Sequence, residues 1–230
     1  LHVDLSGLTT EGAALARLAL DAWADIIGIT IDESAGANGF QITFDDDEAG
    51  AWATSTLSGD TITASHVNIS TDWIAAYGTT ADSYSLQTYL HEIGHALGLG
   101  HAGNYNGSAS TRDMVNAYDS WQATVMSYFS QGQNRTVDAS TAYTLSPMVV
   151  DVAAIQELYG RNSRIYSGDT TYGATTTEDG LWAEIATLLQ SGTLTRPIAF
   201  TIVDSRGTDT LDSSTDTGTQ IISLEELTAS

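Results

Sequence analysis

The sequence predicts an α/β protein of the α+β kind, with a small, twisted, mostly parallel sheet above a long helix and a short β-rich C-terminal segment. Apolar residues at helical spacing over 11–26 and four short β-type segments between residues 27 and 69 indicate the first helix and the sheet. After Gly160 the chain becomes rich in Gly, Ser and Thr, which marks a change of architecture. We therefore expect a first domain over residues 1–160 and a β-rich linker region over 161–230.

The first part of the chain should contain one amphipathic helix and four strands. The apolar stripe of the helix consists of Leu15, Leu18, Ala19, Ala22, Trp23 and Ile26. Short β-branched, aromatic or alternating runs predict strands at 27–33, 40–44, 51–54 and 62–69. The aromatic and aliphatic face of the helix is expected to lie in the core and not in a cofactor site.

A second helix should begin near Ser83 or Ser85 and end at Gly98. Residues 102–145 show little periodicity and many Gly, Asn and Ser residues, which predicts an irregular region. A serine followed by a proline at position 147 is typical of an N-cap and first helical turn, so a third helix should open there and stop at Gly160. One face of that helix would consist of Met148, Val152, Ile155 and Tyr159. Beyond it, the sequence favours a short helix at 181–190 and strands at 197–203 and 219–226.

The most informative segment is 91–101, which reads HEIGHALGLGH and holds three of the five histidines of the chain. His91 and His95 lie about 40° apart around a helix and roughly 6 Å apart along it, so both imidazoles can bind one metal ion. Glu92 lies beside them, where a carboxylate can take a proton from water. Gly98 permits a sharp turn that brings His101 back to the same ion. Three nitrogen ligands with an open fourth position are typical of a catalytic zinc site, and the pattern favours a metallopeptidase.

The histidine pair and the glutamate alone could also occur by chance on a helix that binds no metal. A histidine pair at i and i+4 with an intervening glutamate occurs on many helices without any metal. Chance would also have to place two further residues, Gly98 and His101, at fixed offsets, and this makes a chance occurrence of the full motif rare.

Composition limits the other classes of function. The chain has no cysteine, so neither disulfides nor zinc thiolates are possible. Its net charge is −22, with 29 acidic and seven basic residues, which disfavours nucleic-acid and anionic membrane partners. No apolar run reaches the roughly 18 to 20 residues of a membrane span, and no signal-peptide apolar region is evident. The charge fits a secreted protein in salty or calcium-containing water, or simply a very soluble one, and mildly favours cationic or neutral peptides. We expect a monomer.

A second motif carries a family resemblance. Residues 124–128 read TVMSY, which resembles the Met-turn that follows the zinc motif in the metzincin clan. Within that clan the chain is most similar to the serralysin family, whose characteristic segments match at 105–106, 119–122, 151–156, 158–160, 168–173 and 200–212. Two departures stand out. Ala102 occupies a position that is usually proline, and the family's calcium-binding Gly-Gly-x-Gly-x-Asp repeats are missing.

The resemblance implies a secreted, extracellular zinc endopeptidase that hydrolyses peptide bonds through a zinc-bound water activated by Glu92. It implies that Tyr128 is a fifth zinc ligand or an oxyanion donor, although a core aromatic role stays open. It also implies that Met126 packs beneath the metal and that an edge strand near 51–54 receives extended substrate. Implied partners are protein or peptide substrates and a proteinaceous inhibitor or propeptide. The alternative is a fragment of a longer secreted calcium-repeat protein in which the fold serves binding.

The same resemblance implies calcium binding in the C-terminal part, at the start of a truncated calcium-binding β-sandwich. The ligands would be the carbonyl groups of Tyr166, Gly168 and Thr170 and the carboxylates of Asp204 and Asp209. Without the resemblance, these aspartates read as ordinary solvated loop residues. Arg206 occupies a position that is usually glycine in this family, so the sequence departs there from the family's pattern of carbonyl ligands.

Overall fold

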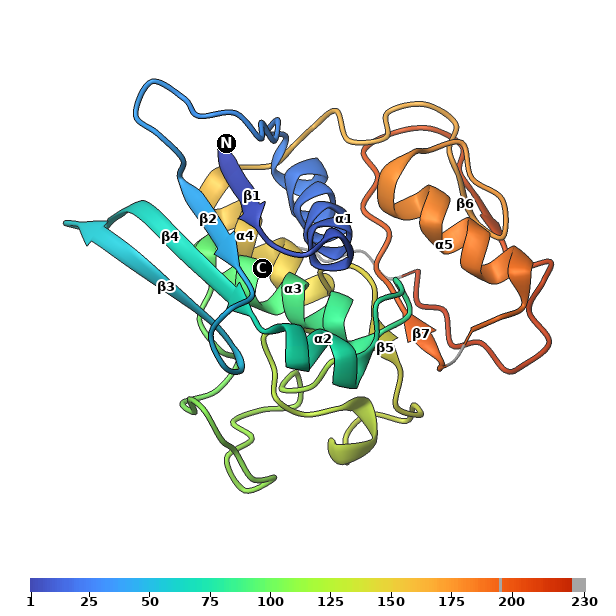
Figure 1. Cartoon of the computed structure of the whole chain (residues 1–230). Coiled ribbons are helices and arrows are strands. Elements are labelled where there is room, and N and C mark those ends of the chain that lie inside the picture. Colours follow the sequence, from blue (N-terminus) through green and yellow to red (C-terminus); the bar gives the residue numbers. More distant parts are fainter. Residues whose placement is uncertain (195, 225–230) are drawn as a thin grey trace.

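The computed structural model describes residues 1–194 and 196–224, and its main sheet is small and mixed (Figure 1). Its strands are β1 (Val3–Gly7), β2 (Ile42–Asp45), β3 (Ala51–Ser58) and β4 (Thr61–Ile69). The order is β1-β2-β4-β3, with two parallel pairs and an antiparallel β3–β4 hairpin. The prediction of a mostly parallel sheet is therefore confirmed, and β3 lies at its edge.

Helix α1 (Thr10–Ile27) packs against this sheet and confirms the predicted amphipathic helix. The Thr9 side chain caps its first turn by accepting a hydrogen bond from the Gly12 amide. Gly28 ends it in the left-handed conformation with φ of 71°, which a residue with a Cβ would resist. The indole of Trp23 is buried and donates to the Leu90 carbonyl at 3.0 Å. This bond ties α1 to the helix that carries the histidine motif.

The histidine motif lies on α3 (Tyr84–Ala96), which follows the short helix α2 (Thr71–Tyr77). The predicted start is confirmed, because the Ser83 hydroxyl caps α3 by accepting from the Leu86 amide at 3.3 Å. The helix ends at Ala96, and Gly98 has φ of 106°, so the glycine makes the expected turn just after the helix. Most of α3 is buried, which makes it the central element of the domain.

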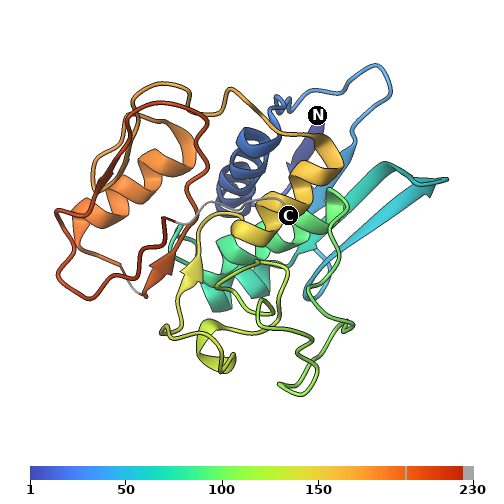
Figure 2. The ribbon, with the colours of Figure 1, turned by 180° about the vertical axis from the view of Figure 1, so that it is seen from behind.

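Residues 97–145 form an irregular lower region that includes the predicted 102–145, and its regular elements are η1 (Gln131–Gln133) and β5 (Tyr143–Thr144). Helix α4 (Val149–Tyr159) follows and runs beside α3 in both views (Figures 1 and 2). Its predicted start was wrong by two residues: the N-cap is Met148, and Asp151 accepts a hydrogen bond from the Met148 amide at 2.8 Å. The Ser146 hydroxyl, which was expected to cap this helix, instead accepts a hydrogen bond from the Thr201 amide at 2.8 Å.

The C-terminal segment contains one helix and three very short strands. These are β6 (Thr171–Gly173), α5 (Gly180–Ser191), β7 (Ile198–Ala199) and β8 (Thr210–Asp212). The helix predicted at 181–190 is confirmed, whereas only two residues of the strand predicted at 197–203 are extended in a sheet. The strand predicted at 219–226 is absent from the described residues 219–224, and residues 225 and 226 lie outside the described part. The division into two domains, at residues 1–160 and 161–230, stays a prediction. In the structure, α5 and α1 contribute side chains to one hydrophobic core.

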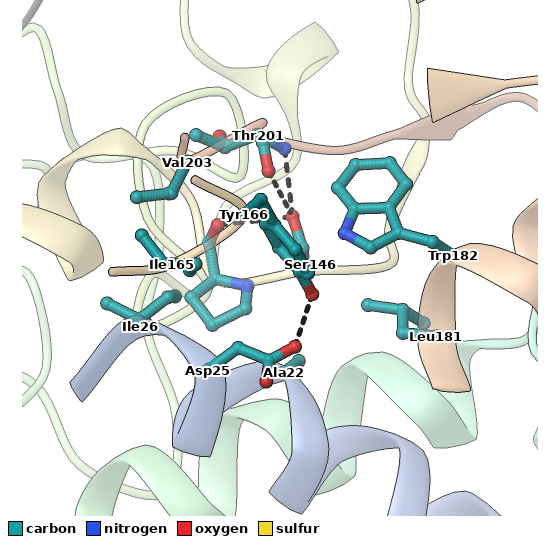
Figure 3. Close-up of a pocket in the computed structure, with 11 residues that line it drawn as sticks. Ala22, Asp25, Ile26, Ser146, Ile165, Tyr166, Leu181, Trp182, Thr201 and Val203 are labelled. Carbon is teal, nitrogen blue, oxygen red and sulfur yellow. Dashed lines mark hydrogen bonds between the residues drawn. The ribbon is translucent and has the colours of Figure 1, made fainter. Parts of the chain in front are cut away.

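The contact between this segment and α1 surrounds a small cavity (Figure 3). Leu181 and Trp182 face it from α5, and Ala22 and Ile26 face it from α1. The Tyr166 hydroxyl donates to the Asp25 carboxylate across the contact. The C-terminal segment is therefore attached by a buried apolar surface and by a polar contact. Within residues 1–194 and 196–224, no helix is both long and apolar enough to cross a membrane.

Candidate metal centre and active site

Three histidine side chains converge at the C-terminal half of α3. The Nε2 atom of His95 lies 3.1 Å from that of His91 and 3.0 Å from that of His101. Among the described residues, this trio is the one group of three or more His, Cys, Asp or Glu side chains placed to hold a metal ion. The three predicted zinc ligands are therefore brought together as the motif requires.

Hydrogen bonds on the far side of two rings determine which nitrogens face each other. His91 Nδ1 donates to the Val125 carbonyl and His95 Nδ1 donates to the Leu99 carbonyl, each at 2.8 Å. Because a carbonyl can only accept, these Nδ1 atoms carry the protons and the Nε2 atoms present lone pairs. Lone pairs about 3 Å apart repel one another unless a cation lies between them. The donor set fits zinc, which binds neutral imidazole nitrogen and is held by rings oriented in this way.

The protonation of the three rings agrees with metal binding. Burial and the neighbouring His95 lower the pKa of His91 to about 3. Burial also lowers the pKa values of His95 and His101. All three imidazoles are therefore neutral near pH 7, and a metal ion does not have to compete with protons.

Glu92 is buried beside the histidine trio, with 7% of its surface exposed. Burial raises the pKa of its carboxyl to about 8. A raised pKa gives the carboxylate a stronger affinity for a proton than an exposed glutamate has. The structure keeps Glu92 next to the first histidine on α3 and buries its side chain, and its role as a general base stays a prediction.

The Met-turn lies directly beneath α3. A Cβ built on Gly94 would lie 2.7 Å from the Met126 sulfur, so only glycine allows this approach. Met126 is buried, as the resemblance implied. The same turn also holds the first histidine, because the Val125 carbonyl is the acceptor for His91.

Asp151 connects the Met-turn to α4 and was not recognised in the sequence as a site residue. It is 1% exposed, and its carboxylate accepts from the Thr124 hydroxyl at 2.5 Å and from the Val125 and Met148 amides at 2.8 Å. The Val125 peptide is thus held on one side by Asp151 and in turn holds His91. Asp151 therefore positions a metal ligand through one intervening residue.

Tyr128 lies over the histidine trio, with its ring centroid 4.6 Å from that of His101 and 5.9 Å from that of His91. Its hydroxyl accepts a hydrogen bond from the Gly107 amide at 3.2 Å. The side chain is partly exposed, unlike the neighbouring Met126 and Phe129, which are buried. This environment is that of a site residue more than of a core aromatic.

Asp119 holds the backbone around Tyr128 through two hydroxyl groups. Like Asp151, it was not recognised in the sequence as a site residue. It is fully buried and accepts from the hydroxyl groups of Tyr105 and Ser127, each at 2.7 Å. The Tyr105 hydroxyl accepts from the Tyr128 amide at 3.3 Å, and the Ser127 hydroxyl accepts from the Phe129 amide at 3.0 Å. Asp119 thereby fixes the backbone on both sides of the Tyr128 side chain. A buried aspartate can be recognised only when its donors are known, because aspartate in a sequence usually indicates exposure.

The five residues expected to bind calcium lie in two segments that the structure brings together. The Thr170 amide donates to Asp209 Oδ1 at 3.0 Å, and a Cβ on Gly207 would lie 2.1 Å from the Gly168 carbonyl oxygen. The Asp204 carboxylate accepts from the Tyr172 hydroxyl at 2.6 Å and from the Arg206 amide at 2.9 Å. Tyr166 has φ of 43°, which is rare for a residue other than glycine. The segments are adjacent, and their role in calcium binding stays a prediction.

A helix that presents two histidines and a buried glutamate, with a third histidine beyond a glycine turn, is typical of zinc metallopeptidases. The sequence profile described as metallo-peptidase family M12B, reprolysin-like, matches residues 9–158. The chain therefore belongs to that family of metallopeptidases.

Curated relatives confirm the resemblance to serralysins. Metalloprotease AprA of Pseudomonas entomophila is 35% identical over 92% of this chain and 45% of its own length. Serralysin C of Dickeya chrysanthemi is 41% identical over 64% of this chain and 30% of its own length. Serralysin of Photorhabdus luminescens is 33% identical over 97% of this chain and 46% of its own length. A solved structure of myroilysin aligns with 70% of this chain and 93% of its own, at 19% identity and a TM-score of 0.43. The chain spans about half the length of the curated relatives it matches at full extent.

Proposed function

We propose that the protein is a secreted, zinc-dependent endopeptidase in which Glu92 moves the proton of peptide hydrolysis. The convergence of three Nε2 lone pairs beside a buried carboxylate is the observation that carries this proposal. His91, His95 and His101 would hold the ion. When bound, zinc lowers the pKa of water towards about 7 and polarises a carbonyl oxygen.

Glu92 supplies the proton transfers. Its carboxylate would accept a proton from the attacking water and then deliver that proton to the nitrogen of the leaving amine. The burial that raises the pKa of this carboxyl supports the second step, in which the protonated group acts as an acid, whereas the first step requires its ionised form. The single side chain would thus act first as a base and then as an acid.

The edge strand β3 offers a place for the substrate backbone. It is last in the sheet order, so one of its sides has no strand partner among the described residues. Free amide and carbonyl groups on such an edge can pair with an extended peptide. The edge supports the proposal that protein or peptide chains bind in extended form, and the acidic charge of the protein favours neutral or cationic ones.

The direct test is hydrolysis of a mixed peptide library by the purified chain, with and without a zinc-selective chelator. Cleavage that the chelator abolishes and added zinc restores is the expected result. A zinc-loaded, folded chain that leaves every peptide intact would overturn the proposal.

Mass spectrometry of the same samples reports the cleaved bonds, and gel filtration checks whether the protein is the monomer that we propose. Incubation with candidate propeptide segments would test inhibition.

Tyr128→Phe should reduce kcat by about 10² to 10³ while KM and the melting temperature change little. The substitution retains the ring that packs on His101 and removes only the hydroxyl that Gly107 contacts. If the hydroxyl binds the metal or an oxyanion, its loss affects catalysis and not folding. Steady-state kinetics and a thermal melt distinguish a catalytic role of the hydroxyl from a role in packing. Full activity together with a lowered melting temperature would favour a packing role.

We also propose that calcium binds between the segments around Gly168 and Asp209. Their close backbone contact supports the proposal. Binding to the folded state alone should stabilise the protein by about 2.7 kcal/mol at a hundredfold excess of calcium over its Kd. Thermal melts in calcium and in a calcium-selective chelator, at constant zinc, measure the effect, with Asp216→Ala as a control and Asp209→Ala as the test variant. An unchanged melting temperature would leave Asp204 and Asp209 as loop carboxylates.

A further inference from the structure

Two asparagines of the chain, Asn38 and Asn106, are followed directly by glycine. In such a pair the backbone nitrogen of the glycine can attack the side-chain carbonyl carbon of the asparagine, because glycine has no Cβ to block the approach. Both asparagines are exposed to water. The pair at positions 106 and 107 differs from the other in what its glycine contacts, since that contact belongs to the active site.

The amide of Gly107 is held by a side chain of the active site. It donates a hydrogen bond to the Tyr128 hydroxyl at 3.2 Å. Gly107 has φ of 74° and lies in a tight turn, with Asn106 and Ser108 paired across it by an isolated bridge. A Cβ built on Gly107 would have no atom within 4 Å beyond its chain neighbours, so the turn is open to solvent. The nitrogen that would react is therefore accessible, and a tyrosine hydroxyl restrains it.

The other pair is held by backbone groups. The Gly39 amide donates to the Gly36 carbonyl at 3.0 Å, and the Gly36 amide donates back to the Gly39 carbonyl at 3.2 Å. Neither bond involves a side chain of the metal centre. Asn38 therefore provides an internal reference for the reactivity of Asn106.

The reaction converts asparagine into an acid without an enzyme. The Gly107 nitrogen loses its proton and bonds to the side-chain carbonyl carbon of Asn106, and the bond from that carbon to the side-chain nitrogen breaks and releases ammonia. The product is a five-membered cyclic imide. Water then opens the ring at one of its two carbonyl groups, which gives aspartate or isoaspartate. In total, one water is consumed, one ammonia is released and one negative charge is gained.

The hydrogen bond to Tyr128 restrains the first step. Before it can attack, the Gly107 nitrogen has to give up the acceptor to which its proton points and turn towards the Asn106 side chain. Any movement of the Tyr128 hydroxyl away from Gly107 removes this restraint. The rate of the reaction at Asn106 should therefore depend on Tyr128, and the rate at Asn38 should not.

The product would disturb the active site through the same contact. Isoaspartate has one extra carbon in the backbone before the Gly107 nitrogen, which adds about 1.5 Å. Tyr105 on the other side is anchored, because its hydroxyl donates to the buried Asp119 at 2.7 Å. The added length should therefore displace Gly107 and break its bond to Tyr128. Both products also place a new carboxylate beside Tyr105, whose ring centroid lies 5.5 Å from that of His101.

We propose that Asn106 is a site of spontaneous deamidation, that the Tyr128 hydroxyl controls its rate, and that the product lowers the activity of the protein over time. The loss of activity rests on the proposed peptidase function, whereas the modification itself does not. The chain would thereby limit its own active lifetime.

The first test follows the modification by peptide mapping and mass spectrometry. The sample is the zinc-loaded Glu92→Gln protein, in which self-digestion should be at least about a hundredfold slower, stored beside a synthetic peptide of residues 103–109. Aspartate and isoaspartate should accumulate at Asn106. Tyr128→Phe in the same background removes the acceptor, so the rate at Asn106 should rise about two- to tenfold, the scale of one hydrogen bond, with no change at Asn38.

Two results of this test would overturn the proposal. The first is an Asn106 that stays unmodified in the protein while the synthetic peptide reacts. The second is a rate at Asn106 that Tyr128→Phe leaves unchanged.

The second test measures how long activity lasts. The wild type, Asn106→Gln and Asn38→Gln are stored under the same conditions, and hydrolysis of the peptide library per intact chain is measured at intervals. Glutamine retains the amide but would have to close a six-membered ring, which is much slower, so Asn106→Gln should retain its starting activity longer than the wild type. Asn38→Gln is the matched control and should decay at the wild-type rate. Equal decay of Asn106→Gln and the wild type would contradict the effect on activity.

The two tests separate failure of the modification site from failure of the peptidase function. A protein that deamidates at Asn106 but cleaves no peptide would retain the site and lose the proposed function. A protein that cleaves peptides while Asn106 stays unmodified would retain the function and lose the site.

Discussion

Glu92→Gln should lower kcat by at least about a hundredfold, as expected when a general base is lost. Glutamine has nearly the same size and shape as glutamate, but its side chain cannot accept and return a proton. The position is buried, and burial already favours the neutral form of the carboxyl, so a neutral side chain should not destabilise the fold. Steady-state kinetics, metal analysis and a thermal melt on the same preparation provide the measurement.

His101→Ala is the informative comparison for this variant. It removes one of the three converging nitrogens, so it should lose zinc at concentrations where Glu92→Gln retains a full equivalent. The two variants would then be inactive for different reasons, one through lost metal and the other through lost proton transfer. Normal turnover by Glu92→Gln with stoichiometric zinc would contradict the role of Glu92.

Asp151→Ala should be the most destabilising of the proposed variants. It leaves the Thr124 hydroxyl and the Val125 and Met148 amides buried without an acceptor. Each unsatisfied donor costs about 1–3 kcal/mol. Removing a buried carboxylate offsets part of that cost, so we expect a net loss of about 3 kcal/mol. At about 2–4 °C for each kcal/mol in a protein of this size, the melting temperature should fall by roughly 10 °C.

The pH dependence of stability offers a second measurement of the same residue. Burial raises the pKa of Asp151 from 3.8 to about 6. The folded protein therefore binds more protons than the unfolded chain between about pH 4 and 6, so this group makes stability fall as the pH rises through that range. Asp151→Ala should lack this contribution, whereas Asp216→Ala, at an exposed loop position, should retain it. Identical pH profiles for Asp151→Ala and the wild type would contradict the assignment.

The elements that the sequence predicted well are those whose information is local. Helices α1 and α3 have strong periodicity and capping side chains at Thr9 and Ser83, and both were placed to within a few residues. Strand β1 and helix α2 were missed, because five and seven residues are too few for a clear period.

The segment 27–33 was wrongly predicted as a strand. Its β-branched residues suit a strand, but α1 continues to Ile27 and the rest of the segment makes only an isolated bridge between Asp32 and His2. The β propensity of a segment is realised only where a neighbouring strand is available, and that neighbour is set by tertiary structure.

The site shows the same division between local and long-range information. Fixed spacing placed His91, Glu92, His95 and His101, and a short motif placed Met126 and Tyr128. The supporting residues Asp119 and Asp151 could not be found in this way, because their donors are 3 to 27 residues away and a buried aspartate looks like an exposed one in a sequence. The misplaced start of α4 has a similar cause: Thr201, 55 residues away, binds the Ser146 hydroxyl.

The open edge of β3 that can receive a peptide is also a risk to the protein in solution. The outer edge of this eight-residue strand offers the same amide and carbonyl groups to the edge of a second copy, which is the first step of edge-to-edge aggregation. The strand itself carries no charged residue to prevent this. The net charge of −22 keeps copies apart at long range. High salt screens that repulsion, so the acidic composition protects the binding edge best in dilute electrolyte.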